Sequence, residues 1–184
     1  KIKYSYIPFK NEKGEENESG IRLKNAEPLL NNKFLLMYCD NYWSLELLKL
    51  EQFYEKKKVD VLVVVYSNRD NFTKNNVLVD NNSFVAKYDK NREDKNLNGV
   101  DIGFFIINKS IFNYFPEGNF QFEKDVLPKL VSKKRVAGFL TDHRYYSISK
   151  PERLEVAEKF LSNKKVVFLD RDGVINKKAS KADY

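Results

Sequence analysis

The sequence predicts an α/β fold in which helices flank a mixed, mostly parallel sheet. Residues 34–40 and 59–66 are dominated by apolar side chains over the length of a strand, which is typical of strands buried on both faces. Residues 45–57 lie between them and repeat apolar side chains at helical spacing. A helix between two buried strands predicts a βαβ unit, whose strands run in the same direction.

The other elements follow from local patterns in chain order. Alternating residues predict a strand over 1–9, and a polar, acidic run predicts a loop over 11–19. A helix over 21–30 should end near Pro28. After residue 67 the sequence predicts, in order, a hairpin of 77–79 and 84–88, a strand over 100–107, short helices over 110–115 (capped by Ser110) and 122–130, strands over 136–140 and 145–148, a helix over 152–161 and a strand over 166–169.

Composition indicates the broad class of protein. A chain of 184 residues that is 42% hydrophobic and 14% aromatic can bury one good core. Its single cysteine, Cys39, excludes an internal disulfide and a multi-cysteine zinc site, and its apolar surroundings predict an inert core residue. No apolar stretch reaches the length of a membrane-spanning helix and no signal peptide opens the sequence. We therefore expect a cytoplasmic protein without a membrane partner.

The formal net charge of +7 suggests an anionic partner. The lysines are spread along the whole chain and accompanied by many acids, and no basic stripe with interleaved aromatic residues occurs. We therefore expect no nucleic-acid partner. A nucleotide or a sugar phosphate fits the sign of the charge equally well. The sequence leaves open whether the protein forms a homo-oligomer.

Asp40 is the first candidate site residue. It ends the apolar run that begins at Phe34, and turn-forming Asn41 follows it. In an open α/β sheet, ligands bind outside the carboxyl ends of the strands, where a single carboxylate is well placed to hold a metal ion. The alternative is that Asp40 caps a helix that begins near Ser44, since Asp is common at that position.

Five short motifs are similar, in order, to those of one enzyme family. They are F-L-L-M-Y-C-D at 34–40, V-A-K-Y-D-K at 85–90, V-D-I-G-F-F-I-I at 100–107, F-E-K-D-V-L-P-K-L at 122–130 and Y-Y-S-I-S-K-P-E-R-L at 145–154. Together they resemble the sugar-phosphate nucleotidyltransferases, which join a nucleoside triphosphate to a sugar 1-phosphate and release pyrophosphate. The resemblance implies that residues 1–163 form a nucleotidyltransferase-like domain with a Rossmann-like sheet and that the cofactor is Mg²⁺.

The resemblance also implies roles for individual residues. Asp40 would hold Mg²⁺, and Lys90 would place a positive charge beside the sugar phosphate. Asp89 and Asp101 have the short polar reach to hydrogen-bond sugar hydroxyls. Gly103, inside a predicted strand, indicates close approach of a neighbour or a ligand. In the structural alternative, Lys90 and Asp89 are solvated loop charges and Asp101 only alternates with buried positions.

The sequence departs from the family pattern at two places. The glycine-rich loop that cradles the triphosphate is absent, so the domain looks truncated at its N-terminus, and only N-E-S-G ending at Gly20 resembles the segment that contacts the base. Ser147 stands where the family has a second metal-holding Asp, and a serine oxygen lacks that negative charge. We therefore expect this chain to transfer nucleotides poorly or not at all. Neither the base nor the sugar follows from the sequence.

A second motif, V-V-F-L-D-R-D-G-V-I-N at 166–176, resembles the first motif of the haloacid dehalogenase superfamily, nearest its histidinol-phosphate and heptose-bisphosphate phosphatases. The resemblance implies that residues 164–184 begin a phosphatase domain. Asp170 would attack phosphorus, Asp172 would act as general acid and base, and both would hold Mg²⁺. The alternative is an ordinary pair of acids after a strand. The later motifs of the superfamily do not follow, so we expect no phosphatase activity from these residues alone.

Together the two resemblances predict a bifunctional enzyme of activated-sugar synthesis, with a heptose as one candidate sugar. The phosphatase would remove one phosphate from a sugar bisphosphate, and the transferase would activate the remaining 1-phosphate. The alternative is a phosphatase whose upstream, transferase-like domain is non-catalytic and only binds a ligand or scaffolds an assembly. Ser147 favours this alternative.

Overall fold

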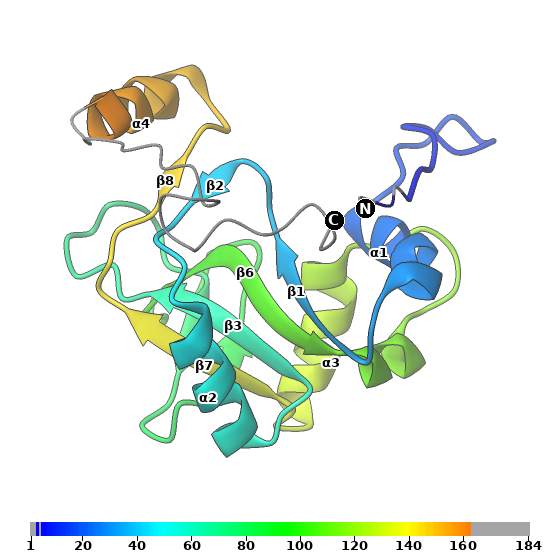
Figure 1. Cartoon of the computed structure of the whole chain (residues 1–184), viewed down its shortest axis with the longest axis horizontal. Helices are drawn as coiled ribbons and strands as arrows, with labels where there is room; N and C mark the ends of the chain where they lie inside the picture. The colour runs from blue at the N-terminus through cyan, green and yellow to red at the C-terminus, as the bar shows by residue number, and fades with distance from the viewer. Residues whose placement is uncertain (1–2, 4, 163–184) are drawn as a thin grey trace, which may run out of the picture. The chain divides into compact units, whose positions relative to one another are not determined.

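The computed structural model describes residues 3 and 5–162, and Figure 1 shows the path of the chain. Lys1–Tyr146 and Ser147–Tyr184 form two compact units, which we describe separately. The main described element of the second unit is α4 (Pro151–Ser162), which begins at a proline as predicted. Among the described residues, no helix combines the length and the apolar character needed to cross a membrane.

A four-stranded sheet is the centre of the described part of the first unit. Its strands lie in the order β1 (Lys33–Met37), β6 (Val100–Asn108), β3 (Val61–Tyr66) and β7 (Val136–Thr141). β6 is antiparallel to both β1 and β3, whereas β3 and β7 are parallel (Figure 1). Along the chain, α2 (Leu47–Lys57) lies between β1 and β3, as the predicted βαβ unit requires.

The mixed sheet with flanking helices confirms the predicted fold class, but the sheet is only partly parallel. β1 and β3 run in the same direction, yet β6 lies between them and pairs antiparallel with both. Within this sheet, as far as the structure describes it, the β3–β7 pairing is the parallel one. A strand inserted from later in the chain cannot be read from the local pattern of a βαβ unit.

Apart from one short strand, β2 (Asn41–Tyr42), which the sequence does not predict, the remaining elements match the predicted order with differences at their ends. They are α1 (Ser19–Ala26), a 3₁₀ turn (Glu27–Leu29), the hairpin strands β4 (Val77–Val79) and β5 (Val85–Tyr88), a 3₁₀ helix (Lys109–Tyr114), a π-helical turn (Phe122–Val126), α3 (Leu127–Ser132) and β8 (Tyr146–Ser147). The predicted strand over 1–9 is wrong for the described residues of that range, which form no strand. Ser110 is not a helix cap, because Asn108 accepts the N–H of Ser110 at 2.8 Å. The predicted strand over 166–169 lies outside the described residues.

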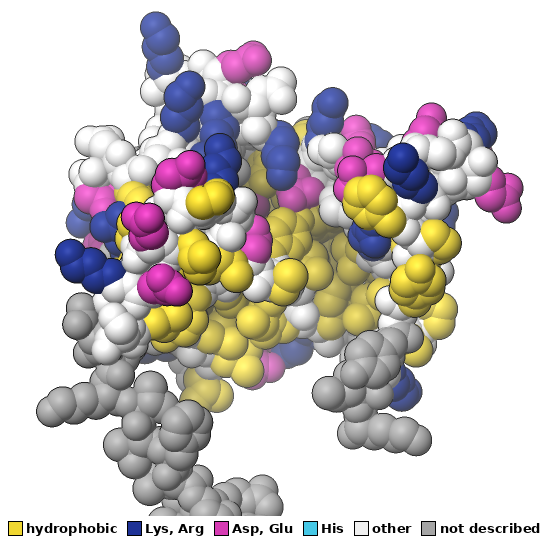
Figure 2. Space-filling model, turned by 90° about the horizontal axis from the view of Figure 1, so that it is seen from above, with side chains coloured by type: hydrophobic (Ala, Val, Ile, Leu, Met, Phe, Trp, Pro, Cys, Tyr) yellow, Lys and Arg dark blue, Asp and Glu magenta, His cyan; other side chains and the backbone are white. Residues whose placement is uncertain are grey.

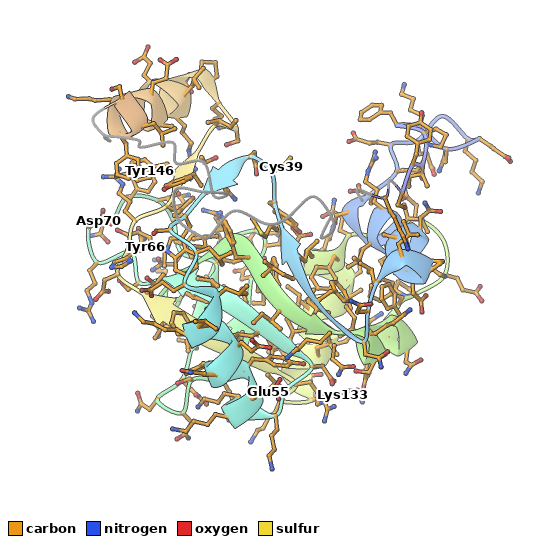
Figure 3. The ribbon with its side chains drawn as sticks, in the orientation of Figure 1. Cys39, Glu55, Tyr66, Asp70, Lys133 and Tyr146 are labelled. Atoms are coloured by element: carbon orange, nitrogen blue, oxygen red, sulfur yellow. The ribbon has the colours of Figure 1, made fainter. Side chains whose placement is uncertain are left out.

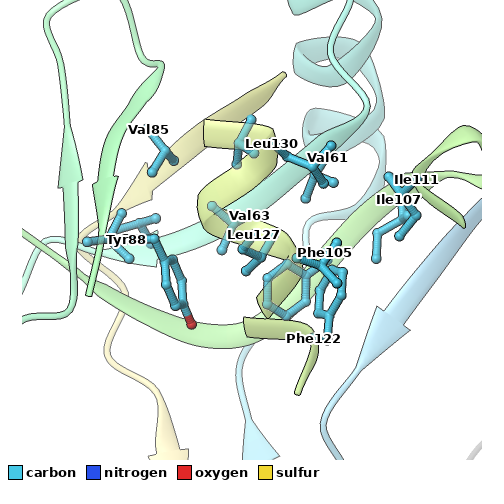
Figure 4. Packing of buried hydrophobic residues seen from close by; sticks show 14 of the residues in the cluster. Val61, Val63, Val85, Tyr88, Phe105, Ile107, Ile111, Phe122, Leu127 and Leu130 are labelled. Carbon is cyan, nitrogen blue, oxygen red and sulfur yellow. The ribbon is translucent and has the colours of Figure 1, made fainter. Parts of the chain in front are cut away.

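The sheet is packed on both faces, because successive side chains of a strand point to opposite sides. In β3, Val63 belongs to one buried cluster and Val64 to another. Leu127 of α3 packs in the first cluster, and Leu50 of α2 packs in the second. Figure 4 shows the first cluster, in which α3 lies against the sheet.

β1 differs from the buried strand that the sequence predicts. It ends at Met37, and its residues are half-buried or exposed. The reason is its place at one end of the sheet, since in the described part of the chain it pairs with β6 on one side only. The prediction that Cys39 is a core residue is wrong, because this side chain is exposed in the turn after β1 (Figure 3).

Gly103 lies at an irregularity of β6. Between Val63 and Val65, two steps along β3 pair across four steps along β6, so β6 contains a bulge there. Gly103 has φ +78°, and an added Cβ would lie 2.9 Å from Cβ of Tyr38 and 3.1 Å from Nδ2 of Asn41. The close approach that the sequence indicates at this glycine therefore comes from Tyr38.

Gly103→Ala should lower the free energy of unfolding by about 2–4 kcal/mol, because it combines a left-handed backbone with a clash at Tyr38. Gly118→Ala is the matched control, since Gly118 has φ +79° but no atom within 4 Å of an added Cβ. The control should lose about 1–2 kcal/mol, the effect of the backbone conformation alone. Urea unfolding of both variants measures the difference, and equal losses would show that the contact with Tyr38 has no energetic weight.

Candidate functional site

Glu123 is the buried carboxylate around which the candidate site is built. Its side chain is 5% exposed and lies in the π-helical turn before α3. The hydroxyl of Tyr38 and Nζ of Lys90 both donate to Oε1, the lysine at 3.2 Å. Oγ of Ser19 donates to Oε2 at 3.0 Å. These donors satisfy a carboxylate from which most water is excluded.

The local sequence holds Glu123 in place through its buried neighbour and a glycine. Phe122 is 1% exposed, and its N–H donates to Oγ of Ser19 at 3.0 Å, so one hydroxyl joins the start of α1 to the turn. At Gly20 an added Cβ would lie 2.3 Å from the ring of Phe120. The helix can therefore approach this turn closely only because residue 20 has no side chain.

Asp101 is the second carboxylate of the site, and it lies in β6 beside the bulge. Oδ2 accepts the hydroxyl of Tyr88 at 2.7 Å, and Oδ1 accepts the N–H of Gly103 at 2.8 Å. Its own N–H donates to Oδ1 of Asn76 at 2.8 Å. Burial raises the pKa of Asp101 to about 6, although the hydrogen bonds from Gly103 and Tyr88 act in the opposite direction.

Glu123 and Tyr38 are held in opposite protonation states at neutral pH. Burial by itself raises the pKa of Glu123, but the Tyr38 hydroxyl and the positive charge of Lys90 outweigh it, and the pKa falls below its ordinary value. The pKa of Tyr38 is raised by burial and by the negative charges of Glu123, Asp101 and Asp40. Glu123 is therefore an ionised acceptor, and Tyr38 is a neutral donor.

Glu123 and Asp101, with the side chains that contact them, form a polar cluster. Three residues named from the sequence belong to this cluster. Lys90 contacts Glu123, Gly103 donates to Asp101, and the charges of Lys90 and Glu123 both act on Asp101. Lys90 follows β5, whereas Asp101 and Gly103 belong to β6. The side chain of Lys90 is 45% exposed, so solvent reaches the cluster at this residue.

Asp40 lies in the turn after β1, near enough for its charge to act on the hydroxyl of Tyr38. The alternative in which Asp40 caps a helix is wrong, because α2 begins at Leu47 and Glu46 occupies the cap position. In the described part of the chain, no group of three or more His, Cys, Asp and Glu side chains is arranged to hold a metal ion. Mg²⁺ commonly takes one or two carboxylates together with the phosphates of a ligand. The role of Asp40 as a ligand of Mg²⁺ therefore stays a prediction.

Asp89 is engaged within its own loop. Its two carboxylate oxygens accept the backbone N–H groups of residues 91–94, at 2.9–3.1 Å. These hydrogen bonds, that of Asp94 above all, lower the pKa of Asp89. The contacts of Asp89 thus agree with the structural alternative, in which it shapes a loop. Asp170 and Asp172 lie outside the described residues.

Glu123, Tyr38 and Ser19 were not predicted from the sequence as site residues. Glu123 had a signal, because it stands between Phe122 and Val126 in a buried stretch, where a carboxylate requires partners. Tyr38 and Ser19 had no local signal, since they lie 85 and 104 positions from Glu123 in the sequence.

An apolar pocket of about 300 Å³ adjoins the cluster. Ser19, Tyr38 and Phe122 line it together with Leu23 and Leu36 of α1 and β1. Figure 2 shows that hydrophobic side chains gather over part of one face of the first unit. The carboxylate cluster and an apolar surface are therefore neighbours at the end of β1.

The chain is similar to several solved structures. One is HddC from Yersinia pseudotuberculosis, with a TM-score of 0.60, 24% identity and 78% of this chain covered. A second is a putative glucose-1-phosphate thymidylyltransferase from Bacillus anthracis in complex with a sucrose, with a TM-score of 0.69, 12% identity and 83% covered. A third is the inositol-1-phosphate CTP transferase from T. maritima, with a TM-score of 0.67, 20% identity and 83% covered.

These similarities establish the fold. The chain has the α/β fold of nucleotidyl-transferring enzymes, which confirms the fold that the five motifs predict. It spans 62% of the length of HddC and 64% of the other two chains. HddC was also solved complexed with GMP-PN, at a TM-score of 0.58 and 23% identity to this chain. Neither a protein-family model nor a curated protein matches the sequence.

The raised pKa of Asp101 predicts a pH dependence of stability. The carboxyl has an ordinary pKa of 3.8 in the unfolded chain but keeps its proton up to about pH 6 in the folded one. Its contribution to stability is therefore present in full below pH 3.8 and is lost as the pH rises through about 6. Relative to Asp101→Asn, the wild type should lose about 2–3 kcal/mol of unfolding free energy between about pH 4 and 7.

Urea unfolding at a series of pH values measures this difference. Asp94→Asn is a control of opposite sign, because the hydrogen bond from Lys87 lowers the pKa of Asp94. That pair stabilises the protein at neutral pH, and its contribution is lost as the pH falls. Parallel stability curves for the wild type and Asp101→Asn would contradict the buried setting of Asp101.

Proposed function

We propose that residues 1–163 form the larger part of a domain that transfers a nucleotidyl group from a nucleoside triphosphate to a sugar 1-phosphate. The observation behind this proposal is the meeting of Lys90, Asp101 and Glu123 in a fold shared with nucleotidyl-transferring enzymes. The reaction requires a cation that faces phosphate and acceptors that orient the sugar. This cluster supplies both.

Lys90 would hold the phosphate of the sugar. An ammonium group has three donors, and the contact with Glu123 uses one of them. Because the side chain of Lys90 is 45% exposed, its other donors would be accessible to a phosphate that arrives from solvent. Asp101 would orient the sugar, and Asp89 would shape the loop that carries Lys90.

The nucleotide would bind as a complex with Mg²⁺, for which Asp40 offers one carboxylate. The HddC structure complexed with GMP-PN supports a nucleotide as the ligand class. The thymidylyltransferase and the CTP transferase carry different nucleotides in their names, so the fold does not select a base. Nucleoside triphosphates and sugar phosphates are cytoplasmic metabolites, and we place the reaction in that compartment.

A phosphatase activity is a second part of the proposal and rests on sequence. Asp170 and Asp172 in V-V-F-L-D-R-D-G would serve as nucleophile and as general acid and base of a phosphatase domain that begins at residue 164. Both would hold Mg²⁺. In a bifunctional protein of this kind, the phosphatase would remove one phosphate from a sugar bisphosphate. The transferase would then join the remaining sugar 1-phosphate to a nucleotide.

The alternative function is binding without transfer. Asp40 provides a single carboxylate, and Ser147 lacks the charge of the Asp that it replaces in the motif. The first unit would then hold a sugar phosphate or a nucleotide and scaffold a phosphatase. The two functions predict the same ligands, but only transfer releases pyrophosphate.

Lys90→Ala should weaken the binding of glucose 1-phosphate to the 184-residue chain by about tenfold or more, because it removes a charged donor to phosphate. Lys87→Ala is the matched control. Lys87 lies in β5 of the same hairpin and pairs with Asp94 at 2.5 Å, so the variant loses the same charge outside the cluster. Isothermal titration calorimetry gives both affinities. If the two variants bind equally weakly, net charge and not the cluster attracts the ligand.

Pyrophosphate release separates transfer from binding. With Mg²⁺, glucose 1-phosphate and, in turn, each of the four common ribonucleoside triphosphates and dTTP, a transferase releases pyrophosphate with at least one of them. The release should fall at least about tenfold in Asp40→Asn, because the carboxylate that holds Mg²⁺ is gone. Calorimetric binding of a triphosphate without any pyrophosphate would establish the non-catalytic alternative. The absence of both would reject the transferase.

A further inference from the structure

We propose that Tyr38 determines which ligands the site accepts, because its hydroxyl uses an acceptor oxygen of Glu123 to which a sugar hydroxyl would otherwise donate. Tyr38 has this effect only if the proposed function holds. The hydroxyl of Tyr38 donates to Oε1 of Glu123, as a sugar hydroxyl would. The protein thus supplies its own competitor for the acceptor.

One oxygen of Glu123, Oε1, already has its full set of donors. Each carboxylate oxygen accepts about two hydrogen bonds, and Oε1 of Glu123 receives the donors of both Tyr38 and Lys90. Oε2 receives Ser19. Because the side chain of Glu123 is only 5% exposed, a ligand hydroxyl can reach Oε1 only if one of its two donors leaves.

Lys90 is not the donor that a ligand needs to displace. Its side chain is 45% exposed, and it has further N–H groups for a phosphate while one stays on Glu123. Tyr38 is different, since its hydroxyl has one proton to donate, which goes to Glu123, and its charge is zero at neutral pH. Loss of Lys90 would also leave the buried carboxylate without a cation, which is unfavourable.

The ring of Tyr38 fills the space as well as the acceptor. Cβ and Cδ2 of Tyr38 lie 2.9 and 3.1 Å from the position of a Cβ at Gly103, and the hydroxyl at the far end contacts Glu123. The phenol therefore reaches from the backbone of β6 to the carboxylate. The ring of Phe105 packs against the ring of Tyr38, with 6.0 Å between the two ring centroids.

The consequence is a site that distinguishes the two ends of its ligand. Inorganic phosphate, which needs only Lys90, binds without disturbing Tyr38. A sugar phosphate gains contact with Glu123 only when the phenol is absent or turned aside. The wild-type protein should bind glucose 1-phosphate mainly through its phosphate group. Removal of the Tyr38 phenol should allow the sugar hydroxyls to hydrogen-bond Glu123 as well.

The test is a calorimetric titration of the 184-residue chain with glucose 1-phosphate and with inorganic phosphate. Tyr38→Ala should bind glucose 1-phosphate about tenfold or more tightly than wild type, the effect of one hydrogen bond to a charged group. Its affinity for inorganic phosphate should stay within about twofold. Tyr38→Phe is the matched control, because it frees the acceptor but keeps the ring, and its affinity for glucose 1-phosphate should match that of wild type.

Tyr38→Leu replaces Tyr38→Ala if the alanine variant does not fold, since leucine keeps apolar contact with Phe105 but ends short of Glu123. Equal binding of glucose 1-phosphate by wild type and by the shortened variant would overturn the role of Tyr38 and leave the proposed function intact. Failure of every variant to bind either ligand would reject the proposed function, and the role of Tyr38 with it.

Discussion

The burial of one carboxylate constrains how the first unit is assembled. Glu123 stays ionised because donors from α1, from the end of β1 and from the end of β5 reach it together. A buried carboxylate without such partners would cost several kcal/mol. Glu123 therefore has all its partners only when the start of α1, the end of β1 and the β4–β5 hairpin are in place together. The site forms as part of folding and not in a later step.

The same contacts that stabilise Glu123 also limit what the site can bind. Lys90 and Tyr38 share one oxygen of Glu123, so a ligand exchanges hydrogen bonds with the protein and does not simply add new ones. Affinity then depends on which donor is released. An exposed lysine and a half-buried tyrosine respond differently to this exchange, which gives the site a means of selection.

Local and repeated signals were sufficient to predict much of the fold. Three predicted features are found in the structure: the run of valines in β3, the turn between β4 and β5, and Pro151 at the start of α4. The half-buried state of β1 was missed, because a strand's place in the sheet depends on partners far along the chain. Lys90 and Asp101 were found through motifs, whereas Tyr38 was not, because its partner lies 85 residues away.

The bulge in β6 keeps the parity of the strand. It adds an even number of residues relative to β3, so Asp101 stays on the same face as Phe105, in the company of Tyr88. Ile102 and Phe104 belong to the cluster on the opposite face. Deletion or insertion of a single residue within the bulge would turn the side chain of Asp101 toward this apolar cluster. Deletion or insertion of two residues would leave it on its own face. During evolution, insertions and deletions in β6 are therefore restricted to two residues at a time.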